Sequence, residues 1–156
     1  MKLLTIDPGA SGGWCLRWSD HIEAHPWISA TDACAALREH FKAGNLTVVV
    51  EAVHSSPVMS PSSAFSFGHN YGTWIGIIVS MTGRTPLGVS PQQWQMPLSD
   101  ELFGLTGSRR KSALNALCKT SYPKLRPTLA TCDAILLSDF CVSYQSTVGH
   151  FPGKFL

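Results

Sequence analysis

The chain of 156 residues carries a net charge of +2, with 44% hydrophobic and 14% charged residues. This length fits a single domain, and the hydrophobic content is too high for a disordered chain. No apolar run approaches the ~20 residues of a membrane-spanning helix, and the short apolar stretch before Asp7 does not fit a secretory signal. We therefore expect a cytoplasmic protein without a membrane partner.

The hydrophobic pattern predicts strands and helices that alternate along the chain. Strands are expected at residues 3–6, 14–18, 22–28, 46–51 and 85–89, the first two antiparallel across a turn. Helices are expected from residue 29 or 31 to about 42, at 62–81, at 108–119 and from 128 or 131 to 144, with a proline-started segment at 91–95. The β-branched run at 46–51 is typical of a strand buried on both faces. The sequence thus predicts a mixed α/β domain at 1–144 and a loose tail at 145–156.

The cysteines and histidines show no spacing typical of a metal or disulfide site. The five cysteines are odd in number and scattered, without a C-x-x-C pair, and neither they nor the six histidines have zinc-ligand spacing. The chain also has no Ser/His/Asp arrangement and no G-x-x-x-x-G-K-[ST] phosphate loop. We expect reduced, buried cysteines and no small-molecule cofactor.

Positive charge gathers in the second half of the chain. Residues 1–78 carry four Lys/Arg against six Asp/Glu, whereas residues 79–156 carry eight against four. Between residues 102 and 132 there are six cations and no carboxylate. Such an excess fits either a surface that attracts a polyanion or an ordinary solvated face.

Three glycines recur every fourth residue in the expected helix at 62–81, namely Gly68, Gly72 and Gly76. At this spacing they share one side of the helix and remove side chains from it, so that another backbone can approach closely. The pattern fits tight packing against the protein's own sheet and contact with a second copy equally well.

Three carboxylates stand in apolar surroundings where carboxylates are unexpected. Asp7 and Glu51 each end a predicted strand, and Asp133 lies on the apolar face of the last helix. Taken singly, Asp7 also fits a turn residue, and Asp133 also fits a helix-start residue stabilised by the helix dipole. If the strands at 3–6 and 46–51 are neighbours, Asp7 and Glu51 meet, because adjacent strands bring side chains within about 5 Å.

A cluster of these three acids would repel itself, because no Lys or Arg lies between Asp7 and Trp14 or between Leu46 and Arg84. A hard divalent cation would relieve the repulsion, since Mg²⁺ prefers oxygen ligands. Two such ions about 3.5–4 Å apart can activate a water and stabilise the leaving oxygen in phosphodiester hydrolysis. The pattern therefore indicates metal-dependent phosphodiester cleavage.

Five motifs in order carry a family resemblance. They are LTIDPGASGG at 4–13, VVVEAVH at 48–54, SAFSFGHNYG at 63–72, VSPQQWQ at 89–95 and TLATCDA at 128–134, with Lys111-Ser112 and Tyr122-Pro123 between the last two. The chain from residue 3 to about 140 thereby resembles the RuvC-like Holliday junction resolvases of the RNase H-like superfamily, especially their phage and prophage branch. For a phage or prophage protein, the cytoplasm would be that of the bacterial host.

The resemblance implies an RNase H-like mixed sheet with helices on both faces, a homodimer, and nicking of four-way or branched DNA with Mg²⁺ or Mn²⁺, two ions per site. It implies that Asp7, Glu51 and Asp133 are metal ligands, that Lys111 lies near the scissile phosphate, and that the glycine-bearing helix dimerises. With the basic stretch, it implies DNA contacts from Arg84, Arg109, Arg110, Lys111 and Lys119, and from His54 or Met59 at a junction-contacting tip.

The sequence departs from the bacterial members of this group at two positions. Ala130 stands three residues before the last acid, where those members carry another carboxylate, and His54 stands where they carry an aromatic wedge. Two alternatives therefore stay open. One is a nuclease with the same fold that acts on RNA or an RNA–DNA hybrid, and the other, which Ala130 favours, is a non-catalytic module that binds branched DNA.

Overall fold

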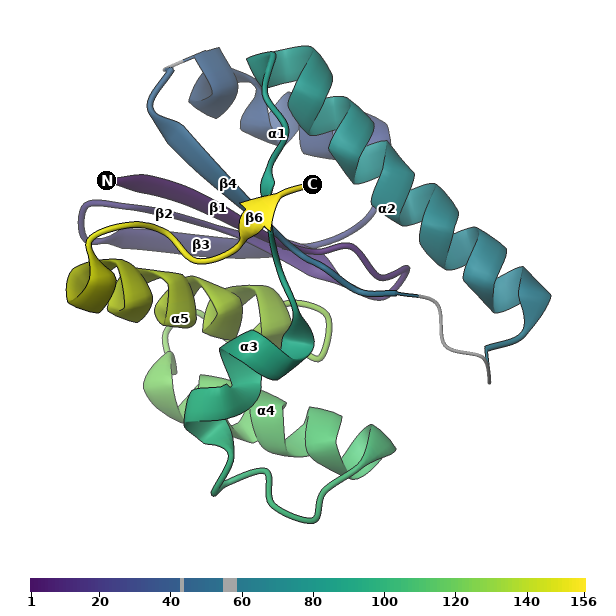
Figure 1. Cartoon of the computed structure of the whole chain (residues 1–156), viewed down its shortest axis with the longest axis vertical. Coiled ribbons are helices and arrows are strands. Elements are labelled where there is room, and N and C mark those ends of the chain that lie inside the picture. The colour runs from purple at the N-terminus through teal and green to yellow at the C-terminus, as the bar shows by residue number, and fades with distance from the viewer. Residues whose placement is uncertain (43, 55–58) are drawn as a thin grey trace.

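The computed structural model describes residues 1–42, 44–54 and 59–156, and a mixed sheet forms its centre (Figure 1). The strands are β1 (Lys2–Asp7), β2 (Gly13–Trp18), β3 (His21–Pro26), β4 (Leu46–Glu51), β5 (Leu87–Val89) and β6 (Lys154–Phe155), in the spatial order β3-β2-β1-β4-β5-β6. β1 pairs antiparallel with β2 and parallel with β4, and β4 pairs parallel with β5. The two parallel ladders place the ends of β1, β4 and β5 at one edge of the sheet.

Helices cover both faces of this sheet (Figure 1). One face carries α1 (Ala30–Lys42) and α2 (Pro61–Thr82), and the other carries α3 (Pro91–Gln95), the 3-10 turn η1 (Met96–Leu98), α4 (Gly107–Ser121) and α5 (Cys132–Val148). Successive residues of β1 point to opposite faces, so Leu4 and Ile6 pack in the cluster under α1 and α2, whereas Leu3 packs in the cluster under α5. The expected α/β architecture with helices on both faces is confirmed.

The C-terminal segment differs from its prediction as a loose tail. Helix α5 continues to Val148, and β6 then pairs antiparallel with β5. The Leu156 side chain lies over Gly88, because a Cβ at Gly88 would come within 2.3 Å of the Leu156 Cδ2 atom. The prediction was wrong because a two-residue strand has no periodicity to detect and is formed by pairing with a distant edge.

The cysteines are all free, as expected, but one of them is not buried. Cys15, Cys118, Cys132 and Cys141 are buried, whereas Cys34 on α1 is partly exposed. Among the described residues, no helix has both the length and the apolar content to cross a membrane.

The N-terminal half of α2 extends beyond the sheet (Figure 1). A Cβ added at Gly68, Gly72 or Gly76 would meet no other described element within 4 Å. These glycines therefore do not serve close packing against the described residues, including the sheet, which removes one of the two interpretations of the stripe. On the same side of the helix, Phe65 is 77% exposed and Val79 is 38% exposed.

Removal of residues 150–156 is expected to lower the melting temperature by several degrees, because β6 would no longer cover the edge of β5 and Phe151 would leave the core. The unpaired edge should also increase aggregation. Thermal unfolding and light scattering measure both effects. Lys154→Ala keeps the backbone pairing and should melt like the wild type, and an unchanged melting temperature after truncation would show that β6 adds no stability.

Candidate functional site

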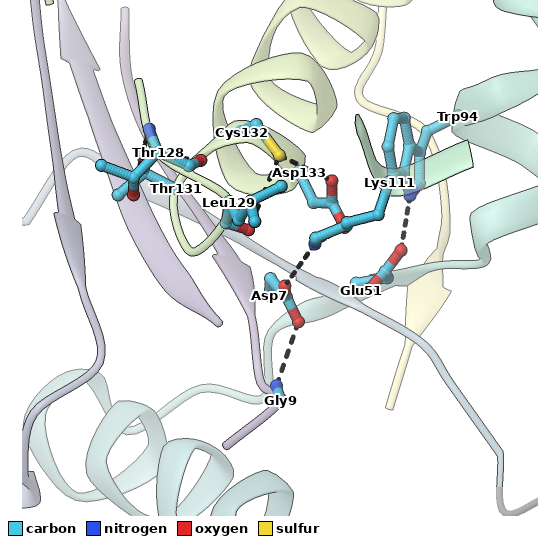
Figure 2. A network of polar contacts seen from close by, with 10 residues as sticks. All are labelled: Asp7, Gly9, Glu51, Trp94, Lys111, Thr128, Leu129, Thr131, Cys132 and Asp133. Carbon is cyan, nitrogen blue, oxygen red and sulfur yellow. Dashed lines mark hydrogen bonds and ion pairs between the residues drawn. The ribbon is translucent and has the colours of Figure 1, made fainter. Parts of the chain in front are cut away.

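Two buried carboxylates lie at the ends of neighbouring parallel strands. Asp7 is the last residue of β1 and Glu51 is the last residue of β4, and the register pairs Ile6 with Val50. As whole residues, Asp7 and Glu51 are only 9% and 7% exposed. The strands at 3–6 and 46–51 are thus neighbours, which was the condition for Asp7 and Glu51 to lie near each other, and the two acids stand at the same end of the sheet (Figure 2).

The turn after β1 is shaped around the Asp7 carboxylate. The backbone N–H of Gly9 donates a hydrogen bond of 3.0 Å to Asp7 Oδ1, and Gly12 approaches so closely that a Cβ there would lie 2.8 Å from the same oxygen. A Cβ at Gly13 would lie 2.4 Å from the His25 carbonyl oxygen and 2.9 Å from that of Ala130. Any side chain at Gly12 or Gly13 would therefore push the carboxylate or its supporting backbone aside.

The third acid is positioned by a buried hydroxyl. Thr5 of β1 is fully buried, and its Oγ1 donates a hydrogen bond of 2.7 Å to the carbonyl oxygen of Ala134 in the first turn of α5. Asp133, the neighbour of Ala134, lies in that same turn, so the helix-start interpretation of this residue is correct as to its position. The Thr5 contact brings the start of α5 to β1 and thus Asp133 towards Asp7.

Lys111 of α4 brings a positive charge between two of these acids. Its ammonium forms an ion pair with Asp133 Oδ2, and its Nζ lies 3.8 Å from Asp7 Oδ2 (Figure 2). Burial disfavours the charged amine, but the attraction of Asp133 and Asp7 outweighs it and raises the pKa of Lys111. The expectation of acids without a nearby cation was wrong, because it considered only residues close in sequence.

Glu51 is held by a residue for which the sequence predicted no role. The indole Nε1–H of Trp94 in α3 donates a hydrogen bond of 2.7 Å to Glu51 Oε1 (Figure 2). Burial, and then repulsion by Asp7, raise the pKa of the Glu51 carboxyl to about 8, and repulsion by Asp133 adds to the shift. Burial likewise raises the pKa of Asp7, although the Gly9 N–H and Lys111 oppose the shift.

The three carboxylates are suitable ligands for a hard cation, but their positions do not form a preorganised metal site. Asp7, Glu51 and Asp133 supply only carboxylate oxygens, which are the ligands that Mg²⁺ and Mn²⁺ prefer. The ammonium of Lys111 already shows that a cation fits between Asp7 and Asp133. Within residues 1–42, 44–54 and 59–156, however, no three His, Cys, Asp or Glu side chains stand close enough together to hold a metal ion. A metal would require these side chains to move closer together.

The basic residues predicted to contact DNA are not all near these acids. Arg84 lines a hollow with Leu46 at the start of β4, roughly 15 Å of strand away from Glu51 at its end. Arg110 is half-buried and donates to Gln95 Oε1 at 2.8 Å, so it holds the turn between α3 and α4. Arg109 and Lys119 are exposed on α4, the helix that also carries Lys111.

The predicted junction-contacting tip flanks a part of the chain that lies outside the described residues. His54 is exposed after β4, and Met59 is partly exposed before α2. Residues 55–58 of the predicted loop between them are not among the described residues. The role of His54 and Met59 therefore stays a prediction.

Comparisons with known proteins concern the fold of this chain. No protein-family model matches the sequence, and no curated protein matches it. The structure is similar to that of Thermus thermophilus RuvC, with a TM-score of 0.56 and 15% identity over 99% of this chain and 100% of that chain. It is also similar to T. thermophilus RuvC in complex with a Holliday junction substrate, with a TM-score of 0.55 and 14% identity over 97% and 99% of the two chains. The expected RuvC-like, RNase H-like fold is thus confirmed, whereas the phage and prophage branch stays a prediction.

Glu51→Gln is expected to stabilise the protein in EDTA, and more strongly at pH 8 than at pH 5. The folded state keeps the Glu51 proton up to about pH 8, whereas an unfolded Glu releases it near 4.5, so wild-type stability falls as the pH rises between these values. Gln has no proton to lose and can still accept from Trp94. We expect the difference in melting temperature to grow by several degrees between pH 5 and pH 8.

The matched control is Glu101→Gln, because Glu101 is exposed. This change should shift the melting temperature little at either pH. A Glu51→Gln effect that is the same at pH 5 and pH 8 would contradict the buried, proton-retaining state of Glu51.

Proposed function

We propose that this protein is a divalent-metal-dependent endonuclease that nicks four-way or branched DNA by phosphodiester hydrolysis. The observation that carries the proposal is the convergence of Asp7, Asp133 and Lys111 beside the buried Glu51. Asp133 of α5 and Lys111 of α4 approach the ends of β1 and β4 in a RuvC-like fold. The similar RuvC structure with a Holliday junction supports branched DNA as the substrate.

Asp7, Glu51 and Asp133 would hold the metal, with Mg²⁺ or Mn²⁺ and two ions per site as the proposed occupancy. When bound, the ions activate a water and neutralise charge that develops on the phosphate. Ala130 and the modest number of carboxylates leave the remaining ligand positions to water, which Mg²⁺ commonly retains.

Lys111 has a second task in this proposal. When a divalent ion takes over the compensation of Asp7 and Asp133, the Lys111 ammonium is free to donate hydrogen bonds to a phosphate oxygen. Its side chain is 34% exposed, so it is accessible to a polyanion from outside. Arg109 and Lys119 on the same helix would bind DNA phosphates, and DNA binding should therefore weaken steeply as salt is added.

A second copy of the chain would pack along the glycine stripe of α2. One side of this helix carries Phe65, Gly68, Gly72, Gly76 and Val79. A Cβ at any of the three glycines would meet no other described element within 4 Å. A homodimer would cover the exposed apolar side chains and would give two sites that address two DNA strands.

Nicking of a four-way DNA junction in the presence of Mg²⁺ tests the proposed activity. We expect Glu51→Gln to lower the nicking rate at least about 100-fold, because a neutral amide is a poor ligand for a hard cation. Glu101→Gln, which alters an exposed carboxylate, should nick at the wild-type rate. EDTA should abolish nicking by the wild type.

Competitors distinguish the alternatives. A four-way junction should compete better than linear duplex DNA or an RNA–DNA hybrid, and preferred cleavage of the hybrid would instead support the RNA-processing alternative. Tight junction binding without nicking under any divalent metal would identify a non-catalytic binding module.

Gly72→Leu is expected to weaken the proposed dimer at least about tenfold, because a branched side chain prevents close approach of two α2 helices. A Cβ at position 72 would meet no other described element within 4 Å, so the fold of the monomer should persist. Sedimentation equilibrium measures the dissociation constant. Ser66→Leu, exposed on a different side of α2, is the control, and a Gly72→Leu dimer of unchanged strength would exclude the stripe as the interface.

A further inference from the structure

Among the described residues, Trp94 is the one whose side chain hydrogen-bonds to the Glu51 carboxylate, and both partners are buried. Trp94 is 1% exposed and Glu51 is 7% exposed, and the 2.7 Å bond joins the indole Nε1–H to one oxygen, Oε1. A buried carboxylate without a hydrogen-bond donor is costly, because desolvation disfavours its charge, and a single donor also restricts how the group can rotate. The indole thus fixes the orientation in which Oε2 is presented.

The pairing of β4 with β5 and the start of α3 together place Trp94 against Glu51. Glu51 pairs with Val89 in the β4–β5 register, and α3 begins two residues after Val89. A capping box starts this short helix: Ser90 Oγ accepts from the Gln93 N–H, and Gln93 Oε1 accepts from the Ser90 N–H. The cap sets the direction of α3 and hence returns the Trp94 ring to Glu51.

Trp74 provides an internal contrast. It is fully buried in the cluster under α1 and α2, on the other face of the sheet, and no partner accepts from its Nε1–H among the described residues. Burial of a large ring therefore does not by itself require a paired indole here. The paired indole of Trp94 occurs at the carboxylate of the candidate site.

We infer that Trp94 is a positioning residue for the metal site, which orients Glu51 so that Oε2 faces the ion while Oε1 stays bound to the indole. This inference rests on the proposed function, because it assumes that Glu51 is a metal ligand. Partners that orient a ligand from behind typically change metal affinity 10–100-fold when they are removed. Trp94 itself contacts neither the metal nor the DNA in this role.

The test is Mn²⁺ affinity measured by isothermal titration calorimetry on the wild type, Trp94→Phe and Trp74→Phe. Trp94→Phe keeps an aromatic ring but loses the N–H, and we expect Mn²⁺ binding about tenfold weaker. Trp74→Phe also loses an indole in a core and should change Mn²⁺ affinity less than about twofold. In a Glu51→Gln background, Trp94→Phe should cause no further loss.

A second replacement at position 94 controls for a loss of packing around the ring. Benzothienylalanine at position 94 keeps the bicyclic shape but carries sulfur in place of the N–H, and it should reproduce the weaker Mn²⁺ binding. Junction binding in EDTA should equal that of the wild type for both changes at position 94, while nicking at subsaturating Mn²⁺ falls.

The results distinguish the positioning role of Trp94 from the metal-dependent function itself. Equal Mn²⁺ affinity of the wild type and both position 94 variants overturns the positioning role and leaves the proposed nuclease intact. An equal loss in Trp74→Phe also overturns it, because general loosening of the core would then explain the effect. A wild type that binds no Mn²⁺ overturns the metal-dependent function and the role of Trp94 with it.

Discussion

The ion pairs of Lys111 set the arrangement on which the site depends. Asp7 ends a strand, Asp133 begins a helix, and Lys111 belongs to a second helix, so one ammonium joins three elements that are distant in sequence. Without this charge, two nearly buried carboxylates would face each other in a medium where repulsion is strong. The protein therefore assembles its acids around a cation that it carries itself, and a metal would replace an existing interaction instead of filling an empty one.

Much of the fold could be predicted because its signals are local. The β-branched run of β4 and the glycine-rich turn between β1 and β2 specify strands by residue type alone. Local signals did not give the end of the helix that carries Asp133, and they did not predict that β6 pairs with β5. The end of α5 and the two residues of β6 depend on packing and on a free edge of β5, which are tertiary properties.

The acids of the candidate site could also be predicted, since carboxylates in apolar surroundings are unusual. Their partners could not. Nothing in the local sequence separates Arg110, which holds the turn before α4, from its exposed neighbour Arg109. The bond between Trp94 and Glu51 likewise depends on the β4–β5 register and on the direction of α3, which appear only when the chain is folded.

The glycines fall into two groups according to whether an added Cβ would clash within the chain. At positions 12 and 13, a single methyl group would collide with main-chain atoms within the same molecule. At positions 68, 72 and 76, it would meet no other element in the described part of the chain, and helix propensity alone would favour alanine there. Selection for a folded monomer would therefore retain the first pair and erode the other three. The fold of the single chain therefore does not account for glycine at those three positions.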